Sequence, residues 1–251
     1  MNILLVLAFL FYIGSMLGWV LELFFRRLIS KTGKWINPGF LVGPYLPLYG
    51  FGLCILFLMA SGEAYFPPIP DYLKKLLLFI LMAVMMTAIE YIAGIIFIKH
   101  MKVELWNYNN EWGNIDGIIC PKYSLFWAIL GAMYYFFIHP HILSALAWLS
   151  DNLAFSFFVG LFYGFFIIDF VYSAQLLVKI RQFAKENEIV VRFEELKLSI
   201  IQFAEEKKKK RKHFRFFFSL SPDIPLSEHL KRYHEAKKRL ENDIKSIIKK
   251  K

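Results

Sequence analysis

Cysteine is scarce in this sequence, and charge is scarce over long stretches of it. The two cysteines, Cys54 and Cys120, form no C-x-x-C pair, so neither a disulfide framework nor a cysteine zinc site is supported. Long runs carry almost no Asp, Glu, Lys or Arg, and 57% of all residues are hydrophobic. A soluble domain holds roughly 45–50% apolar residues. The composition therefore excludes an ordinary soluble domain and predicts an integral membrane protein.

Signatures of nucleotide and metal chemistry are also missing. The stretch Ser30-Lys31-Thr32 lacks the glycines of a phosphate-binding loop, so we expect no ATPase in this chain. The six histidines contain no H-E-x-x-H pattern. We therefore expect neither a metal nor another cofactor, and the absence of these motifs argues against an enzyme.

Five segments are apolar enough to cross a bilayer, which takes about 20 residues per helix. We place them at 3–25, about 40–60, 74–98, 123–138 and 152–178. The fourth has 16 residues before His139-Pro140-His141, and we interpret it as a short span followed by an interfacial helix at 142–150. A long helix kinked at Pro140 is the alternative. The predicted fold class is an all-α, polytopic membrane protein with five transmembrane helices.

Positive charge is concentrated at the C-terminal end. Residues 1–178 hold nine bases and nine acids, so the whole net charge of +10 lies in 179–251. This predicts a transmembrane domain over 1–178 and a basic, helical cytoplasmic tail over 179–251. The bases at 26–34, compared with the acidic loop at 61–71, place the N-terminus outside and the tail inside a bacterial-type inner membrane.

Three acids lie inside the predicted spans, where a central carboxylate costs about 2.5–3.5 kcal/mol. Glu22 lies near the inner end of the first span, and Glu90 and Asp169 lie near the midplane in the third and fifth. We interpret them as part of a polar cavity that binds or moves a cation, a proton or a polar headgroup. The alternative is interhelical hydrogen bonding, with Glu22 also held by Arg26 at i+4.

Two loops on the predicted inner side could border this cavity. The segment 34–52 has three prolines and four glycines but is too apolar for a solvated loop, which predicts a re-entrant or broken-helix element or a cap packed on its neighbours. The loop 104–124 is rich in asparagine, which suits either interfacial turns or the cavity mouth. The loop residues expected at the cavity are Asn37, Tyr45, Tyr49, Trp106, Asn107, Tyr108, Asn109 and Asp116.

Three segments carry a family resemblance. They are GWVLELFFR at 18–26, NPGFLVGPYLPLYGFG at 37–52 and LWNYNNEWGNIDGIICPKYSLFW at 105–127. In order and spacing they resemble the CmpB-like family of type IV ABC-transporter permeases, which is similar to a group of vertebrate transmembrane proteins. The resemblance covers about 1–178, although Pro38 and Asn107 stand where we expect Arg and Asp. It implies a permease-like membrane component whose energy comes from a separate ATPase.

The tail shows three features. Apolar positions from Ile180 to Phe203 recur every three or four residues, which predicts an amphipathic helix continuing from the fifth span. A seam from Leu226 to Ile247 favours a coiled coil or packing on the preceding helix. Between them lies a polybasic stretch that suits anionic lipid better than nucleic acid. Its lipid-binding residues are Lys207, Lys208, Lys209, Lys210, Arg211, Lys212 and Arg215.

The sequence therefore predicts a membrane subunit of a transporter that moves a small polar or cationic solute. Five helices are few for a solitary pathway, which indicates a homo-oligomer with Gly160-x-x-x-Gly164 as a candidate contact. One alternative is a membrane-embedded enzyme that acts on lipid headgroups with Glu22 or Asp169 as acid or base. Another is a non-catalytic scaffold that recruits partners through its basic tail.

Overall fold

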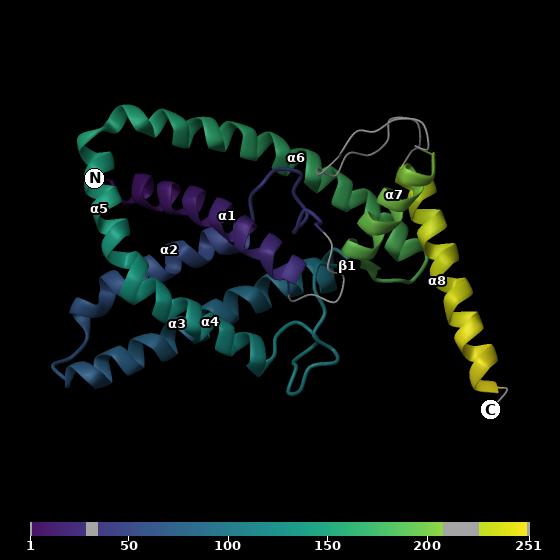
Figure 1. Ribbon diagram of the computed structural model, residues 1–251, viewed down its shortest axis with the longest axis horizontal. Coiled ribbons are helices and arrows are strands. Elements are labelled where there is room, and N and C mark those ends of the chain that lie inside the picture. Colours follow the sequence, from purple (N-terminus) through teal and green to yellow (C-terminus); the bar gives the residue numbers. More distant parts are fainter. Residues whose placement is uncertain (1, 29–34, 208–225, 250–251) are drawn as a thin grey trace.

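The structure, a computed structural model, describes residues 2–28, 35–207 and 226–249, which are almost entirely helical (Figure 1). The helices are α1 (Ile3–Leu28), α2 (Pro47–Ser61), α3 (Asp71–Gly94), α4 (Pro121–Met133), α5 (His139–Asp151), α6 (Ser156–Glu186), α7 (Phe193–Lys207) and α8 (Leu226–Lys249). Shorter helical turns are η1 (Gly62–Tyr65), η2 (Ile95–His100), η3 (Tyr134–Ile138) and η4 (Leu153–Phe155). Two short strands, β1 (Val103–Glu104) and β2 (Val191–Arg192), pair in parallel.

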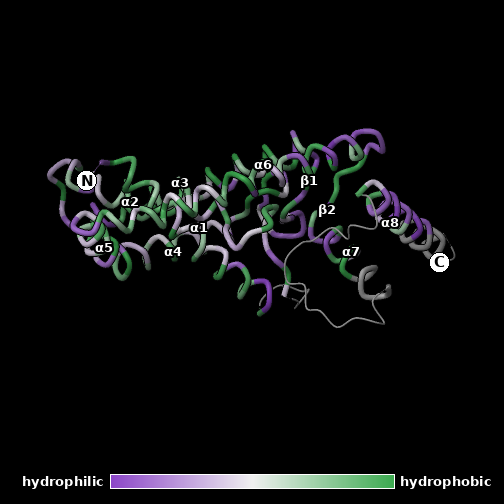
Figure 2. Tube along the Cα trace, turned by 90° about the horizontal axis from the view of Figure 1, so that it is seen from above, coloured by the Kyte–Doolittle hydropathy of each residue, from purple (hydrophilic) through white to green (hydrophobic). Residues whose placement is uncertain are grey.

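In the described part of the chain, five helices are long and apolar enough to cross a membrane, which confirms the predicted fold class. They are Ile3–Leu28, Pro47–Tyr65, Asp71–His100, Pro121–Asp151 and Leu153–Glu186. Figure 1 shows the N-terminus and the turn from α5 to α6 at one end of the molecule, with β1, α7 and α8 at the other. Hydrophobic residues predominate along the bundle, and hydrophilic residues on α8 (Figure 2). The chain is a multi-pass membrane protein.

The fourth span is one long helix. The chain is helical without interruption from Pro121 to Asp151, through α4, the π-helical turn η3 and α5. The predicted short span with a separate interfacial helix at 142–150 is therefore wrong, and the single long helix of the alternative is confirmed. Pro140 is the second residue of α5 and lies two residues after the end of the π turn. A proline lacks the amide for an α-helical bond, and the wider turn before it accommodates this loss.

The tail does not continue from α6 as one helix, so that prediction is also wrong. The helix α6 ends at Glu186, Glu188 adopts a φ of 53°, and β2 then pairs with β1, with Val191 opposite Val103. Both valines are fully buried. β-Branched residues suit a buried strand better than a helix, so this pairing breaks the amphipathic run and turns α7 back onto the end of the bundle (Figure 1).

Three apolar clusters hold these parts together. The first fills the bundle of α1 to α5, the second joins the last turns of α6 to β1, β2, α7 and α8, and the third packs α1 and α6 on the segment 41–45. Leu226, Leu230 and Tyr233 of α8 are buried in the second cluster, so this part of the seam packs on the preceding helices. The polybasic residues from Lys208 to Arg215 lie outside the described residues, and nothing is described of the Lys207 side chain.

Small residues let α1 and α2 cross closely. A Cβ atom added at Gly18 would lie 2.1 Å from the Cβ of Tyr49, and one added at Gly14 would lie 2.8 Å from the Cβ of Leu53. Neither distance is tolerated between real carbon atoms. The close crossing places the Tyr49 side chain against α1, beside Glu22.

We expect Gly18→Ala to destabilise the protein, because the added methyl group must displace Tyr49. Overpacking of this kind costs about 1–3 kcal/mol. Thermal unfolding of the purified chain in detergent measures the loss. Gly62→Ala is the control, since nothing lies within 4 Å of a Cβ atom added there. Equal melting temperatures for both variants would contradict the close α1–α2 crossing.

Candidate functional site

The segment 35–46, which leads into α2, is irregular backbone. It contains no helix before α2 begins at Pro47, and its side chains Ile36, Asn37, Leu41 and Tyr45 are buried. Irregular backbone near a membrane needs partners for its open amides and carbonyls. In this protein the partners come from α1, α6 and α7.

Asp169 of α6 binds the middle of this segment. Its carboxylate accepts the backbone N–H groups of Val42 (3.1 Å) and Gly43 (2.7 Å) and the hydroxyls of Tyr45 (2.6 Å) and Ser173 (2.9 Å). Four donors occupy about as many sites as a carboxylate offers. The structure thus brings Tyr45 to Asp169 and gives this acid a hydrogen-bonding role at the segment.

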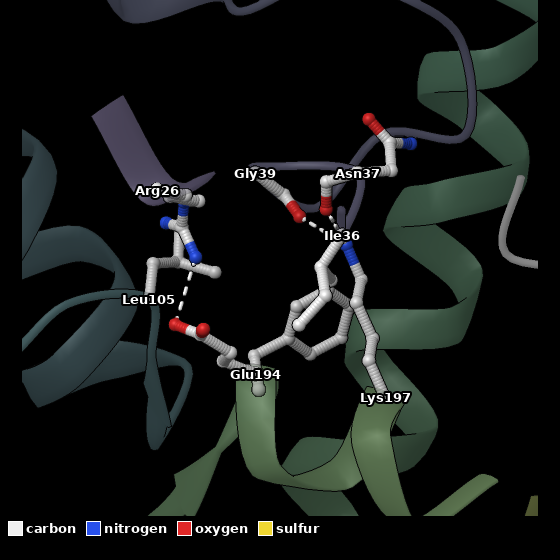
Figure 3. A pocket seen from close by; sticks show the side chains of 8 residues that line it. Arg26, Ile36, Asn37, Gly39, Leu105, Glu194 and Lys197 are labelled. Carbon is white, nitrogen blue, oxygen red and sulfur yellow. Dashed lines mark hydrogen bonds and ion pairs between the residues drawn. The ribbon is translucent and has the colours of Figure 1, made fainter. Parts of the chain in front are cut away.

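Asn37 fixes the start of the segment. Its side-chain oxygen accepts the indole N–H of Trp19 (2.6 Å), and its amide group donates to the carbonyls of Leu41 (3.1 Å) and Val42 (2.9 Å). Its backbone carbonyl and that of Gly39 accept the ammonium of Lys197, at 2.8 and 2.7 Å (Figure 3). Asn37 is therefore a clamp within the loop and lines neither of the two large cavities.

Lys197 is a buried base that sequence reasoning missed. Its side chain comes from α7, and the residue is 3% exposed. Burial, followed by the nearby Arg26 guanidinium, lowers the pKa of Lys197 to about 7. The signal was present in the sequence: Phe193, Leu196, Lys197 and Ile200 follow the i, i+3, i+4, i+7 pattern of one helix face. Lys197 was hidden among the many solvated bases of the tail.

Glu22 is linked to both the bundle and the tail. It accepts Nε of Arg26 at 2.9 Å, which confirms the expected i+4 pair, and it accepts the Tyr49 hydroxyl at 3.0 Å. Arg26 also contacts Glu194 of α7 at 2.8 Å (Figure 3). A continuous series of hydrogen bonds and ion pairs therefore links Tyr49 to α7 through Glu22, Arg26 and Glu194.

Glu90 occupies a different environment from Asp169. It is 3% exposed, and its two oxygens accept the Tyr108 hydroxyl at 3.0 Å and the Trp127 indole N–H at 2.9 Å. Burial raises the pKa of Tyr108, so this phenol stays protonated and donates. Within the described part of the chain, Glu90 has no basic partner at ion-pair distance.

Two cavities border this group of residues. A loop-side cavity of about 430 Å³ lies between α1, α3, the segment 39–49 and residues 105–108. An α4-side cavity of about 400 Å³ lies between α1 and α4. Both are lined by Glu22, Tyr49, Glu90, Tyr108 and Trp127. We call these five residues the acidic partition. The remaining walls are mostly aliphatic and aromatic.

The Asn-rich loop divides into two groups. Trp106 donates to the carbonyl of Ile118 (2.9 Å) and lines the loop-side cavity. Asn107 donates to Glu104 (2.8 Å) and accepts the backbone N–H of Asn109 (2.7 Å), so it has a hydrogen-bonding role. The remaining predicted residues, Asn109 and Asp116, are absent from both cavity walls, and Asp116 pairs with Lys99 at 2.7 Å.

Of the predicted cavity residues, five line one or both of the two large cavities: Glu22, Tyr49, Glu90, Trp106 and Tyr108. Trp127 joins them and was not predicted. Its indole N–H within a membrane helix needs an acceptor, and this requirement could have singled it out. The described residues contain no group of three or more His, Cys, Asp or Glu that could hold a metal.

Comparison with known proteins gives the family. A family model described as "Putative ABC-transporter type IV" matches residues 9–174, from α1 into α6. Comparison with curated proteins and with solved structures finds no match. The family match covers more than half of the chain and contains all three intramembrane acids. The chain therefore belongs to this ABC-transporter type IV family, ABC_trans_CmpB, as the three sequence segments predicted.

Proposed function

We propose that this protein is the permease-like subunit of a transporter that moves a small polar or cationic solute through the cavities at the acidic partition. Membership of an ABC-transporter family supports the class of function. Within the cavities, Glu22 and Glu90 are the acids that contact the solute, and Tyr49, Tyr108 and Trp127 hold them in place. Asp169, which we first expected in the cavity, instead keeps the loop 42–45 in position.

Glu90 is the observation that carries the proposal. A carboxylate in the middle of a membrane helix is costly unless it is paired, protonated or solvated. Glu90 has two neutral donors and faces two cavities, each larger than the about 300 Å³ of a small ligand pocket. An acid that only linked helices would not need such space beside it.

The inner end of the bundle is a suitable docking site for a separate ATPase that would supply the energy. The chain has no phosphate-binding loop, so a separate ATPase must hydrolyse the nucleotide. We propose that it docks on the cytoplasmic end, where α7 contacts Arg26 and the segment 35–46. The Tyr49–Glu22–Arg26–Glu194 connection then couples movement of α7 to the cavities. In this scheme the N-terminus lies outside an inner membrane, and the basic stretch 207–215 binds anionic lipid.

A homo-oligomer fits the exposed side of α6. A Cβ atom added at Gly160 or Gly164 meets no atom within 4 Å, so the described part of one chain leaves this stripe uncovered. Small residues on a membrane helix allow close approach of a second helix. We propose this stripe as the contact between two copies. The enzyme alternative has less support, because Asp169, one of its two candidate acids, already accepts four hydrogen bonds.

Replacing Glu90 with Gln tests the transport proposal. The full chain is captured from its own membranes, reconstituted with the ATPase that accompanies it, and assayed for ATP-dependent uptake of labelled polar and cationic solutes. We expect at least a tenfold loss of uptake, because the amide carries no charge. Glu63→Gln is the matched control, since Glu63 also accepts a tyrosine hydroxyl, from Tyr135, at a distance from both cavities. Absence of any ATP-dependent uptake by the unaltered complex would refute the proposal.

A further inference from the structure

We propose that the acidic partition binds an organic ammonium ion with apolar substituents, either a quaternary ammonium or a protonated amine. This inference rests on the proposed function, whose solute class it narrows. It places the positive charge beside Glu90 and the apolar substituents in the two flanking cavities. Charge, ring geometry and the cavity walls support it separately.

The charge at the partition favours a cation. None of the described residues that line the α4-side cavity is a base, whereas Glu22 and Glu90 are both acids. The loop-side cavity adds one base, Arg26, which already contacts Glu22 and Glu194. Glu90 accepts two hydrogen bonds and retains about two free lone-pair directions. One positive charge in the cavity would balance Glu90.

Aromatic rings surround the same carboxylate. Tyr108 and Trp127 hold its two oxygens, and the Tyr49 and Trp127 rings lie 5.5 Å apart. Trp106 extends the aromatic lining on the loop side. The faces of tyrosine and tryptophan attract cations, most strongly where water is excluded, and aromatic cages recognise quaternary ammonium groups in this way. An acid among tyrosine and tryptophan rings is a suitable site for such a group.

The walls disfavour a small, strongly hydrated ion. Ca²⁺ takes six to eight oxygen ligands, whereas the two acids and two tyrosines of the partition offer six at most, and both tyrosine hydroxyls already donate to the acids. The other wall residues suit hydrocarbon groups. Several also reach the outer surface of the bundle, including Phe24 (50% exposed), Phe51 (56%) and Ile92 (57%). These helices span the membrane, so an amphipathic cation can enter from the lipid.

A binding measurement separates this site from an ordinary apolar pocket. Phenyltrimethylammonium and tert-butylbenzene have the same shape, but only the first is charged. Both are titrated calorimetrically into the full chain in maltoside micelles, which contain no ammonium group, and blank micelles are subtracted. We expect the cation to bind at least tenfold more tightly than the neutral compound. Equal affinities would overturn the proposal, as would failure of the cation to bind.

Substitutions of single acids test whether Glu90 is the group that binds the cation. Glu90→Gln should weaken binding of the cation at least tenfold and leave that of the neutral compound unchanged, whereas Glu63→Gln should alter neither. Unchanged cation binding by Glu90→Gln would overturn the assignment. If that variant fails to fold, the comparison of the two ligands on the unaltered chain still decides the question. Cation binding without uptake would refute only the proposed function, and uptake of another solute without cation binding would refute only this inference.

Discussion

Replacing Asp169 with Leu is expected to abolish the folded protein. The substitution leaves four donors without an acceptor: two backbone amides, at Val42 and Gly43, and the hydroxyls of Tyr45 and Ser173. Each buried donor left unpaired costs about 1–3 kcal/mol. The total is comparable to the whole stability of many proteins, which is about 5–15 kcal/mol. Fluorescence-detected size exclusion should show little monodisperse protein.

Two further variants are needed to interpret the effect of Asp169→Leu on folding. Asp169→Asn keeps one acceptor oxygen but turns an NH₂ group toward the donors, so we expect an intermediate yield and a lower unfolding midpoint. Asp151→Leu is the matched control, since Asp151 is exposed at the end of α5. If Asp169→Leu folded normally and lost only transport, Asp169 would instead be a solute-binding residue, as its sequence position first predicted.

The different roles of Glu90 and Asp169 show what the sequence could predict and what it could not. Counting residues from a helix end estimates the depth of a side chain in the membrane, and on that basis the two acids look equivalent. Their neighbours depend on the rotation of each helix and on the path of the loop 35–46, neither of which follows from hydropathy. The five spans were predictable because length and apolarity alone define a spanning helix.

Contacts between residues far apart in the sequence were the other feature that could not be predicted. Lys197 binds carbonyl groups more than 150 residues earlier, and β2 pairs with a strand that precedes α4. A two-residue strand is too short to produce an alternating pattern, so the break after α6 resembled a continuing amphipathic helix. Glu22, Tyr49 and Tyr108 line the two cavities, and acids and tyrosines in an apolar setting need partners wherever they lie; their contact with a solute stays a prediction.

Docking of α7 is expected to strengthen as the pH rises above neutral. Lys197 has a pKa of about 7 in the folded protein, against an ordinary value of 10.5. Between these values the unfolded chain binds more protons than the folded one, so the free energy of unfolding rises with pH. The rise is limited to about 1.4 kcal/mol per pH unit and levels off below pH 7 and above pH 10.5. Unfolding midpoints at intervals from pH 6 to pH 10 measure it.

Two substitutions at Lys197 complete the test. Lys197→Met cannot titrate, so its unfolding midpoint should change less between pH 7 and pH 10, although the carbonyls of Asn37 and Gly39 lose their donor. Lys197→Arg keeps a charge that does not titrate in this range and should be less stable than the unaltered chain at pH 9. Because Lys197 holds the segment that Asp169 also holds, both losses should loosen the loop beside the acidic partition. An identical pH dependence in the unaltered chain and in Lys197→Met would show that another group titrates.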